Sequence, residues 1–140
     1  LKTQNEAELL LQLCQTASRE GTTAEAVRWL LAAGADPNVT NEMMESALAL
    51  AVQTVGRLDR DSWEWEACLK VVAALLEGGA NPNSADSQGE TPMHEAASAG
   101  SVELCQLLID KRADPAHPGS TGITPAYLAL DFSDVVSLLN

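Results

Sequence analysis

A short block of residues recurs three times along this chain and sets the strongest limit on its fold. It reads Gly-Ala-Asp-Pro-Asn at 34–38, Gly-Ala-Asn-Pro-Asn at 79–83 and Arg-Ala-Asp-Pro-Ala at 112–116. The first two copies begin 45 residues apart and the last two 33 residues apart. Apolar residues at helical spacing precede each copy, and self-similarity at this period indicates stacked helix-pair repeats. The chain is therefore predicted to be all-α and to bury its apolar residues between neighbouring repeats.

The segment before the third copy carries the clearest motif. Residues 89–97 combine a turn glycine, a Thr-Pro helix start, a histidine and two alanines small enough for neighbouring helices to approach closely. Pro92 suits the first turn of a helix, and Gly100 separates it from a second helix. The Thr-Pro-x-His-x-Ala signature and the 33-residue period resemble the ankyrin-repeat family. The resemblance implies a solenoid of helix-turn-helix units with hairpin fingers, in which His94 is structural, hydrogen-bonds near the turn and braces adjacent repeats.

The resemblance implies that residues 1–140 form one ankyrin-repeat domain, which consists of about four repeats. Their expected bounds are 5–38, 41–83, 86–116 and 119–140. The second repeat holds twelve surplus residues, and these are expected as an insertion at 56–67, extruded as a loop before a second helix at 68–76.

The first and fourth repeats depart furthest from the motif. The first lacks Thr-Pro and instead has a capping-box pattern from Asn5 to Glu8, with Gly21 expected to separate its two helices. The fourth has Tyr127 where histidine is usual and is two residues short, so a tighter turn is expected between its helices.

The formal net charge is −12, which bears on the class of partner. Nucleic acid and anionic membrane surfaces attract basic proteins, so both are unlikely partners. A protein with a basic or neutral contact surface fits better, although acidic residues can also serve solubility alone. No apolar run approaches the roughly 20 residues needed to span a bilayer.

The cysteines and histidines offer little for catalysis. Cys14, Cys68 and Cys105 are widely spaced among apolar residues, which favours buried thiols in a reducing compartment, either the cytosol or an organelle interior. His117 lies between two prolines and is expected to be exposed, but a triad with Cys105 is rejected because that thiol falls on a core face. No catalytic, cofactor or metal-binding residue is predicted. The start at Leu1 leaves open whether the chain is a processed product, a fragment or part of a longer one.

The family resemblance implies that partners bind the concave surface formed by the finger tips and the exposed side of the first helices. Carried over to this sequence, those positions are Glu42, Met43, Glu45, Gln53, Thr54, Ser87, Gln88, Glu90, Ser98, Ala99, Ser120, Thr121, Ile123, Asp131 and Phe132. Carboxylates at 42, 45, 90 and 131 would give the groove a negative potential, which complements a Lys- or Arg-bearing segment. The alternative is that these residues are merely solvated.

The tryptophans of the insertion form a second candidate surface. Trp63 and Trp65 are two residues apart, so a helix cannot bury both on one face. One is expected to pack within its repeat and the other to be exposed, either as a partner contact or as an anchor for its own loop.

Together these features predict a non-catalytic protein–protein interaction module. It is either an adaptor that captures a basic segment in its acidic groove or a permanent scaffold or accessory subunit of a larger assembly. The irregular repeats and the insertion favour a dedicated partner. An enzyme or small-molecule binder is the third and least favoured class.

Overall fold

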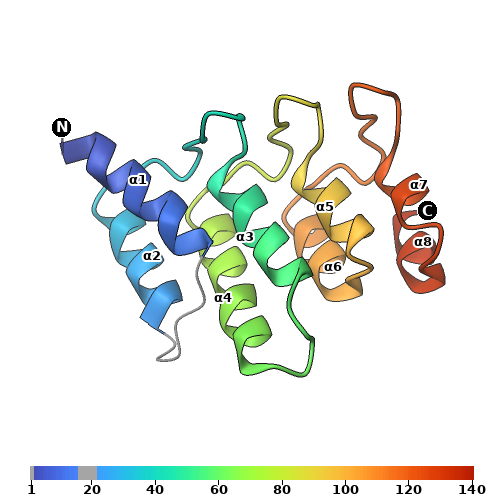
Figure 1. Ribbon diagram of the computed structural model, residues 1–140, viewed down its shortest axis with the longest axis horizontal. Helices are drawn as coiled ribbons and strands as arrows, with labels where there is room; N and C mark the ends of the chain where they lie inside the picture. Colours follow the sequence, from blue (N-terminus) through green and yellow to red (C-terminus); the bar gives the residue numbers. More distant parts are fainter. Residues whose placement is uncertain (1, 16–21) are drawn as a thin grey trace.

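The structure is a computed structural model that describes residues 2–15 and 22–140. Within these residues the only regular elements are eight helices, which stack as four antiparallel pairs along one axis (Figure 1). They are α1 (Lys2–Cys14), α2 (Thr22–Ala32), α3 (Ala47–Gly56), α4 (Trp63–Glu77), α5 (Pro92–Ser98), α6 (Val102–Asp110), α7 (Pro125–Leu128) and α8 (Ser133–Leu139). Hairpin fingers join one pair to the next, and each finger is numbered by the repeat that it opens, so Met43 lies in the second finger, Ser87 in the third and Ile123 in the fourth. The predicted all-α solenoid is confirmed.

Serine and threonine side chains fix where half of these helices begin. In four helices a hydroxyl oxygen accepts a hydrogen bond from the backbone N–H three residues later, which satisfies a donor that the helix cannot. The capping residues are Ser46, Ser62, Ser101 and Thr124. Proline follows Thr91 and Thr124 at the first helical position, as the motif predicts.

The core lies between successive pairs. Leu48 of α3 and Met93 of α5 occupy equivalent positions and are both fully buried. Ala96 and Ala97 are also fully buried, so their small size allows α3, α5 and α7 to approach one another. Each pair packs chiefly on its neighbours, and stability is the sum of these interfaces.

The recurring block ties neighbouring repeats together through asparagine side chains. The Asn38 Oδ1 atom accepts from the N–H of Asn81 at 2.7 Å, and the Asn83 Oδ1 atom accepts from the N–H of Asp114 at 2.7 Å. The Asn83 Nδ2 atom also donates to the carbonyl oxygen of Arg112 at 3.2 Å. The repetition seen in the sequence is thus a ladder of inter-repeat hydrogen bonds.

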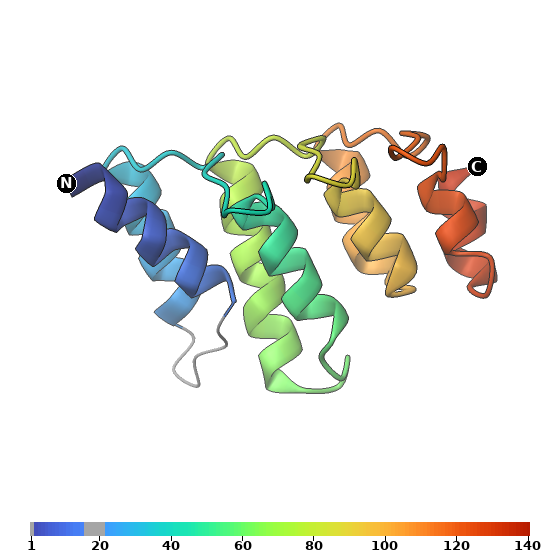
Figure 2. The same ribbon diagram turned by 45° about the horizontal axis from the view of Figure 1, so that its top comes forward.

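The insertion is not the loop that was expected at 56–67. The helix α4 begins at Trp63, five residues before the predicted start at Cys68, so only residues 57–62 form the loop. The reason is that Ser62 caps the helix and Trp65 packs against the core, which stabilises an additional turn. Figure 2 shows the result, since the α3–α4 pair projects beyond the other pairs.

The structure revises two expectations for the terminal repeats, and a third concerns a residue outside the described ranges. The capping box from Asn5 to Glu8 is wrong, because α1 already runs from Lys2 and no helix breaker precedes Asn5. The fourth repeat is shorter because its first helix, α7, has four residues where α5 has seven. The turn before α8 is not tighter than the turn before α6, so the expected tighter turn is wrong. The break at Gly21 falls outside the described residues.

The finger tips place one residue each in the left-handed backbone region. Gly89 and Gly122 both have φ +79°, which glycine adopts without steric penalty. The equivalent residue of the preceding finger is Met44, with φ +62°. Arg112 is similar, with φ +71° where Gly79 stands one repeat earlier. Non-glycine residues pay about 1–2 kcal/mol for this conformation, so Met44 and Arg112 are held there by the surrounding fold.

Candidate protein-binding surface

The fingers lie along one edge of the stack, next to the first helix of each pair (Figure 2). The Ser87 N–H donates to the carbonyl oxygen of Met43 at 3.1 Å, which joins the second finger to the third. The His94 Nε2 atom lies 2.9 Å from the carbonyl oxygen of Ile123, which fixes the fourth finger against α5. These hydrogen bonds hold the fingers in fixed positions relative to one another and to α5.

Most of the predicted contact residues reach solvent. Those that are exposed are Glu42, Met43, Ser87, Gln88, Ser98, Ala99, Ser120, Thr121, Ile123, Asp131 and Phe132. Those that are half-buried are Glu45, Gln53, Thr54 and Glu90. The expectation that Thr54 contacts a partner is corrected, because its hydroxyl donates to backbone carbonyl oxygens. The hydroxyl oxygen lies 2.8 Å from the Leu50 carbonyl oxygen and 3.1 Å from that of Cys14. It joins α3 to α1 and is not available to a partner. Phe132 packs over Gly100, where an added Cβ would lie 2.6 Å from its ring.

Carboxylates gather around Gln53 at the junction of the second and third repeats. The Gln53 Nε2 atom donates to Glu45 at 2.9 Å and lies 3.4 Å from Glu95. Burial raises the pKa of Glu95 above its ordinary value, and the carboxylates of Glu90 and Asp86 raise it further. Hydrogen bonds from Gln53 and Asn41 lower the pKa of Glu45. We call Glu45, Asp86, Glu90 and Glu95 the acidic cluster.

Sequence reasoning found half of this cluster. Glu45 and Glu90 were predicted, but Asp86 and Glu95 were missed. The sequence did contain a signal for Glu95. This residue occupies the unspecified position of the Thr-Pro-x-His-x-Ala motif, between the structural His94 and the buried Ala96.

Replacing Glu95 by Gln should raise the free energy of unfolding at pH 7 by about 0.5 kcal/mol. The folded-state pKa is raised, so the ionised carboxylate disfavours the folded state once the pH exceeds its unfolded value. The gain should shrink as the pH falls through the raised folded-state pKa and should be nearly gone below 4.5, the ordinary value, because both states are then protonated. Urea unfolding at pH 7 and pH 4 measures both effects. Glu25→Gln, on the exposed face of α2, is the control and should change stability little. A loss of stability in Glu95→Gln at pH 7 would show that its ionised form is favourable.

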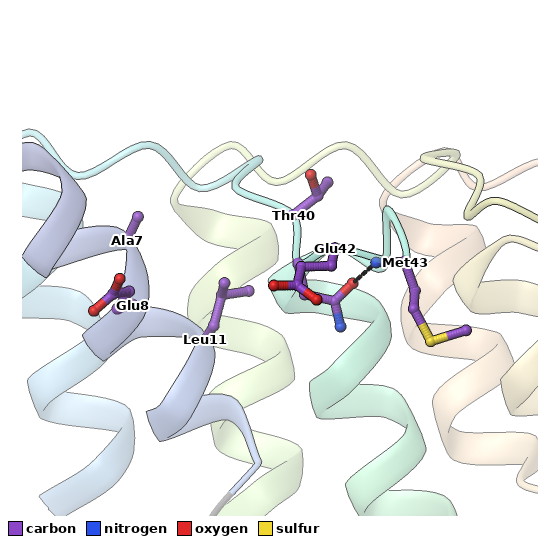
Figure 3. Close-up of a pocket in the computed structure, with 7 residues that line it drawn as sticks. Ala7, Glu8, Leu11, Thr40, Glu42 and Met43 are labelled. Carbon is purple, nitrogen blue, oxygen red and sulfur yellow. Dashed lines mark hydrogen bonds between the residues drawn. The ribbon is translucent and has the colours of Figure 1, made fainter.

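A groove of about 700 Å³ opens between α1 and the second finger. Its lining residues are Ala7, Glu8, Leu11, Thr40, Asn41, Glu42 and Met43. In Figure 3 the Leu11 side chain lies between the carboxylates of Glu8 and Glu42. The Asn41 Oδ1 atom accepts from the N–H of Met43 at 2.9 Å and from that of Glu45 at 3.0 Å, which holds the finger in a tight turn. Two predicted contact residues, Glu42 and Met43, are among its lining residues, and in Figure 3 the Met43 side chain points away from α1.

The insertion braces the second repeat against the third. Trp65 is half-buried and borders a cavity of about 110 Å³ with Leu58 and the turn before α6. Arg60 forms an ion pair with Glu103 of α6. Trp63 remains 43% exposed, so the two tryptophans differ as their spacing predicts. Trp65 therefore packs within the stack, whereas Trp63 is accessible to a partner.

The residues considered for catalysis have structural surroundings. His94 is 1% exposed, and its Nδ1 atom accepts from the N–H of Thr91 at 3.0 Å, so its Nε2 atom carries the proton donated to Ile123. The expected exposure of His117 is wrong. Its ring packs edge-on against His94 with centroids 6.0 Å apart, because the finger folds back over α5. Burial raises the pKa of Cys105 to about 11, which leaves a thiol that is a poor nucleophile at neutral pH.

Over residues 2–15 and 22–140, no group of three or more His, Cys, Asp or Glu side chains is arranged to hold a metal ion. No described helix combines the length and apolar character required to cross a membrane.

Comparison with known proteins agrees with the fold. The family model for ankyrin repeats (3 copies) matches residues 64–140. The chain is 46% identical over 56 residues, 39% of its length, to neurogenic locus notch homolog protein 4 of Homo sapiens. It is 32% identical over 114 residues, 80% of its length, to the neurogenic locus Notch protein of Drosophila melanogaster. It is 42% identical over 59 residues, 41% of its length, to the 2-5A-dependent ribonuclease of Mus musculus.

These relatives are far longer than the chain, which spans 3%, 4% and 8% of them respectively. What they share with it is the repeat, a unit that binds other proteins. The matched motif, the stacked helix pairs and the structural His94 agree, and the chain belongs to the ankyrin-repeat family.

Proposed function

We propose that residues 1–140 act as one ankyrin-repeat domain that binds a basic segment of a partner protein on its concave face, without catalysing a reaction. The acidic cluster carries this proposal. The other three carboxylates disfavour the ionisation of Glu95, since burial and then Glu90, Asp86 and Glu45 raise its pKa. A Lys or Arg side chain placed among them would relieve that repulsion, so charge complementarity favours a basic ligand.

A permanent place in a larger assembly is the second candidate, and exposed apolar side chains support it. Trp29 of α2 is 79% exposed, although the equivalent residue of the next repeat, Ala74, is 1% exposed. At the other end, Leu130 is 64% exposed where its equivalent Ala97 is fully buried. Extensive apolar contact is typical of obligate interfaces and resists salt, whereas exposed charge pairs are screened.

The buried thiols support a reducing compartment, either the cytosol or an organelle interior. Burial raises the pKa of Cys14 to about 12, with a further contribution from Cys68. All three cysteines are buried and free of disulfides. Thiols of this kind serve packing, and they are typical of proteins kept away from an oxidising environment.

Co-purification of the native protein with its partner, repeated at high salt, tests the proposed function. The concave variant carries Glu45→Gln, Glu90→Gln and Glu95→Gln. The matched control carries Glu25→Gln, Glu66→Gln and Glu77→Gln, which remove the same charge from exposed positions of α2 and α4. If the concave face binds a basic segment, the partner should be lost at high salt and from the concave variant only.

Each other result has a definite meaning. A partner that survives high salt and both variants would establish a permanent subunit held by apolar contact. Equal loss from both variants would reduce the acidic residues to a general effect of net charge. Failure to recover a stoichiometric partner under any condition would contradict the binding function itself.

A further inference from the structure

Two carboxylates flank the groove between α1 and the second finger. Glu8 of α1 and Glu42 of the finger are both exposed. Within residues 2–15 and 22–140, neither forms an ion pair or a side-chain hydrogen bond. Both are among the lining residues of the groove, none of which is basic. The groove therefore presents negative charge that the described residues do not neutralise, which favours a cationic occupant.

The surface between these carboxylates is apolar. Ala7 and Leu11 of α1 line the groove and are half-buried, and Leu11 packs against the core. In Figure 3 the Leu11 side chain lies between the carboxylates of Glu8 and Glu42. A small ion would leave this apolar surface uncovered. Lysine and arginine match both parts of the groove, because each carries a charged group on an aliphatic stem that covers apolar surface.

The second finger holds Glu42 in place before a partner binds. The side chain of Asn41 is committed to the turn, since its Oδ1 atom accepts from two backbone N–H groups and its Nδ2 atom donates to Glu45 at 2.8 Å. The turn is also closed by the Met44 N–H, which donates to the Asn41 carbonyl oxygen at 3.0 Å. A preformed wall lowers the free energy that ordering would otherwise cost on binding.

The same finger also contributes to the acidic cluster. Glu42 lines the groove beside α1, whereas Glu45 accepts a hydrogen bond from Gln53 of α3 at 2.9 Å. A partner segment that crosses the second finger can therefore place one basic side chain in the groove and another at the cluster. The groove extends the acidic face into the first repeat.

We propose that the groove between α1 and the second finger binds one lysine or arginine side chain of the partner segment. The aliphatic stem lies on Ala7 and Leu11, and the charged group lies between the carboxylates of Glu8 and Glu42. This inference rests on the proposed function and adds to it a site in the first repeat that recognises the stem of a basic side chain as well as its charge.

Two fluorescent peptides of equal charge test the groove in the intact chain. Each has four basic residues separated by glycines, which are lysines in one peptide and diaminobutyrates in the other. Diaminobutyrate has the same ammonium group on a stem that is two methylenes shorter, and both are charged at about pH 6. Burial of the longer stem should make the lysine peptide bind about tenfold tighter, as measured by fluorescence anisotropy.

Leu11→Ser should bring the ratio of the two affinities close to one, because it removes the apolar surface on which the stem lies. Leu9→Ser is the matched control. Leu9 is 44% exposed on the same helix and does not line the groove, so its substitution should leave the ratio unchanged. Circular dichroism checks that both variants are folded.

A second pair of variants tests the carboxylates without touching the core. The groove variant carries Glu8→Gln and Glu42→Gln, and its control carries Glu25→Gln and Glu77→Gln, which remove the same charge from exposed positions of α2 and α4. The groove variant should bind the lysine peptide about fivefold more weakly than the control does. If Leu11→Ser fails to fold, this comparison decides alone, because both substituted positions of the groove variant are exposed.

The outcomes distinguish this inference from the proposed function. Equal binding of the two peptides, abolished by salt and by the concave variant, would overturn the groove site and leave the acidic face standing. A preference for lysine that survives in folded Leu11→Ser would also overturn it, as would equal affinities of the groove variant and its control. Failure of the chain to bind either peptide would contradict both proposals.

Discussion

Replacing His94 by Ala should lower the free energy of unfolding by about 3 kcal/mol. The side chain is fully enclosed, so the substitution leaves a cavity. It also leaves the Thr91 N–H and the Ile123 carbonyl oxygen without the partners that they have at 3.0 Å and 2.9 Å. Urea unfolding followed by circular dichroism gives the value. The loss should be largest for the fourth repeat, since the bond to Ile123 holds its finger.

Tyr127→Ala is the matched control for this prediction. Tyr127 occupies the same motif position one repeat later and is 62% exposed, so its removal should cost less than about 0.5 kcal/mol. A similar loss in the two variants would mean that the contacts of His94 with Thr91 and Ile123 contribute nothing to stability.

Replacing Gly89 by Ala should be about as damaging, at roughly 3 kcal/mol. Two effects add. The residue has φ +79°, which an L side chain disfavours, and an added Cβ would lie 2.5 Å from the backbone nitrogen of Ser120. Because the obstacle is backbone of the next finger, it cannot move aside without separating the third finger from the fourth. Thermal and urea unfolding both report the loss.

Gly122→Ala isolates the two effects. Gly122 has the same φ of +79°, but an added Cβ would meet nothing within 4 Å. Its substitution should therefore cost only the backbone part, about 1 kcal/mol. The difference between the variants measures how closely the fingers must approach. No difference between them would show that the fingers separate freely.

The repeated parts of the molecule were predictable because their chemistry is local. Thr-Pro at a helix start and a recurring Asp-Pro-Asn block are readable from sequence, since the capping hydroxyl and the turn residues act within a few positions. His94 was predictable because the motif specifies its partners. These features fixed the stack and the concave face.

The parts that could not be predicted depend on contacts between repeats. Trp65 extends α4 only because the third repeat offers a place for it to pack, and the sequence of the insertion does not reveal that place. His117 is covered because its finger folds over His94. Thr54 turns inward toward the backbone of α1. Spacing within one repeat carries no information on any of these three.

The groove spans the junction between the first repeat and the second, and this has a consequence for folding. In a linear stack, the terminal repeats unfold more readily than the interior ones, because they have a single neighbour. A ligand that contacts both α1 and the second finger would act as a further neighbour for the first repeat. Its binding should therefore slow amide hydrogen exchange in α1 and α2 more than in α5 and α6, so that recognition at one end also completes the folding of that end.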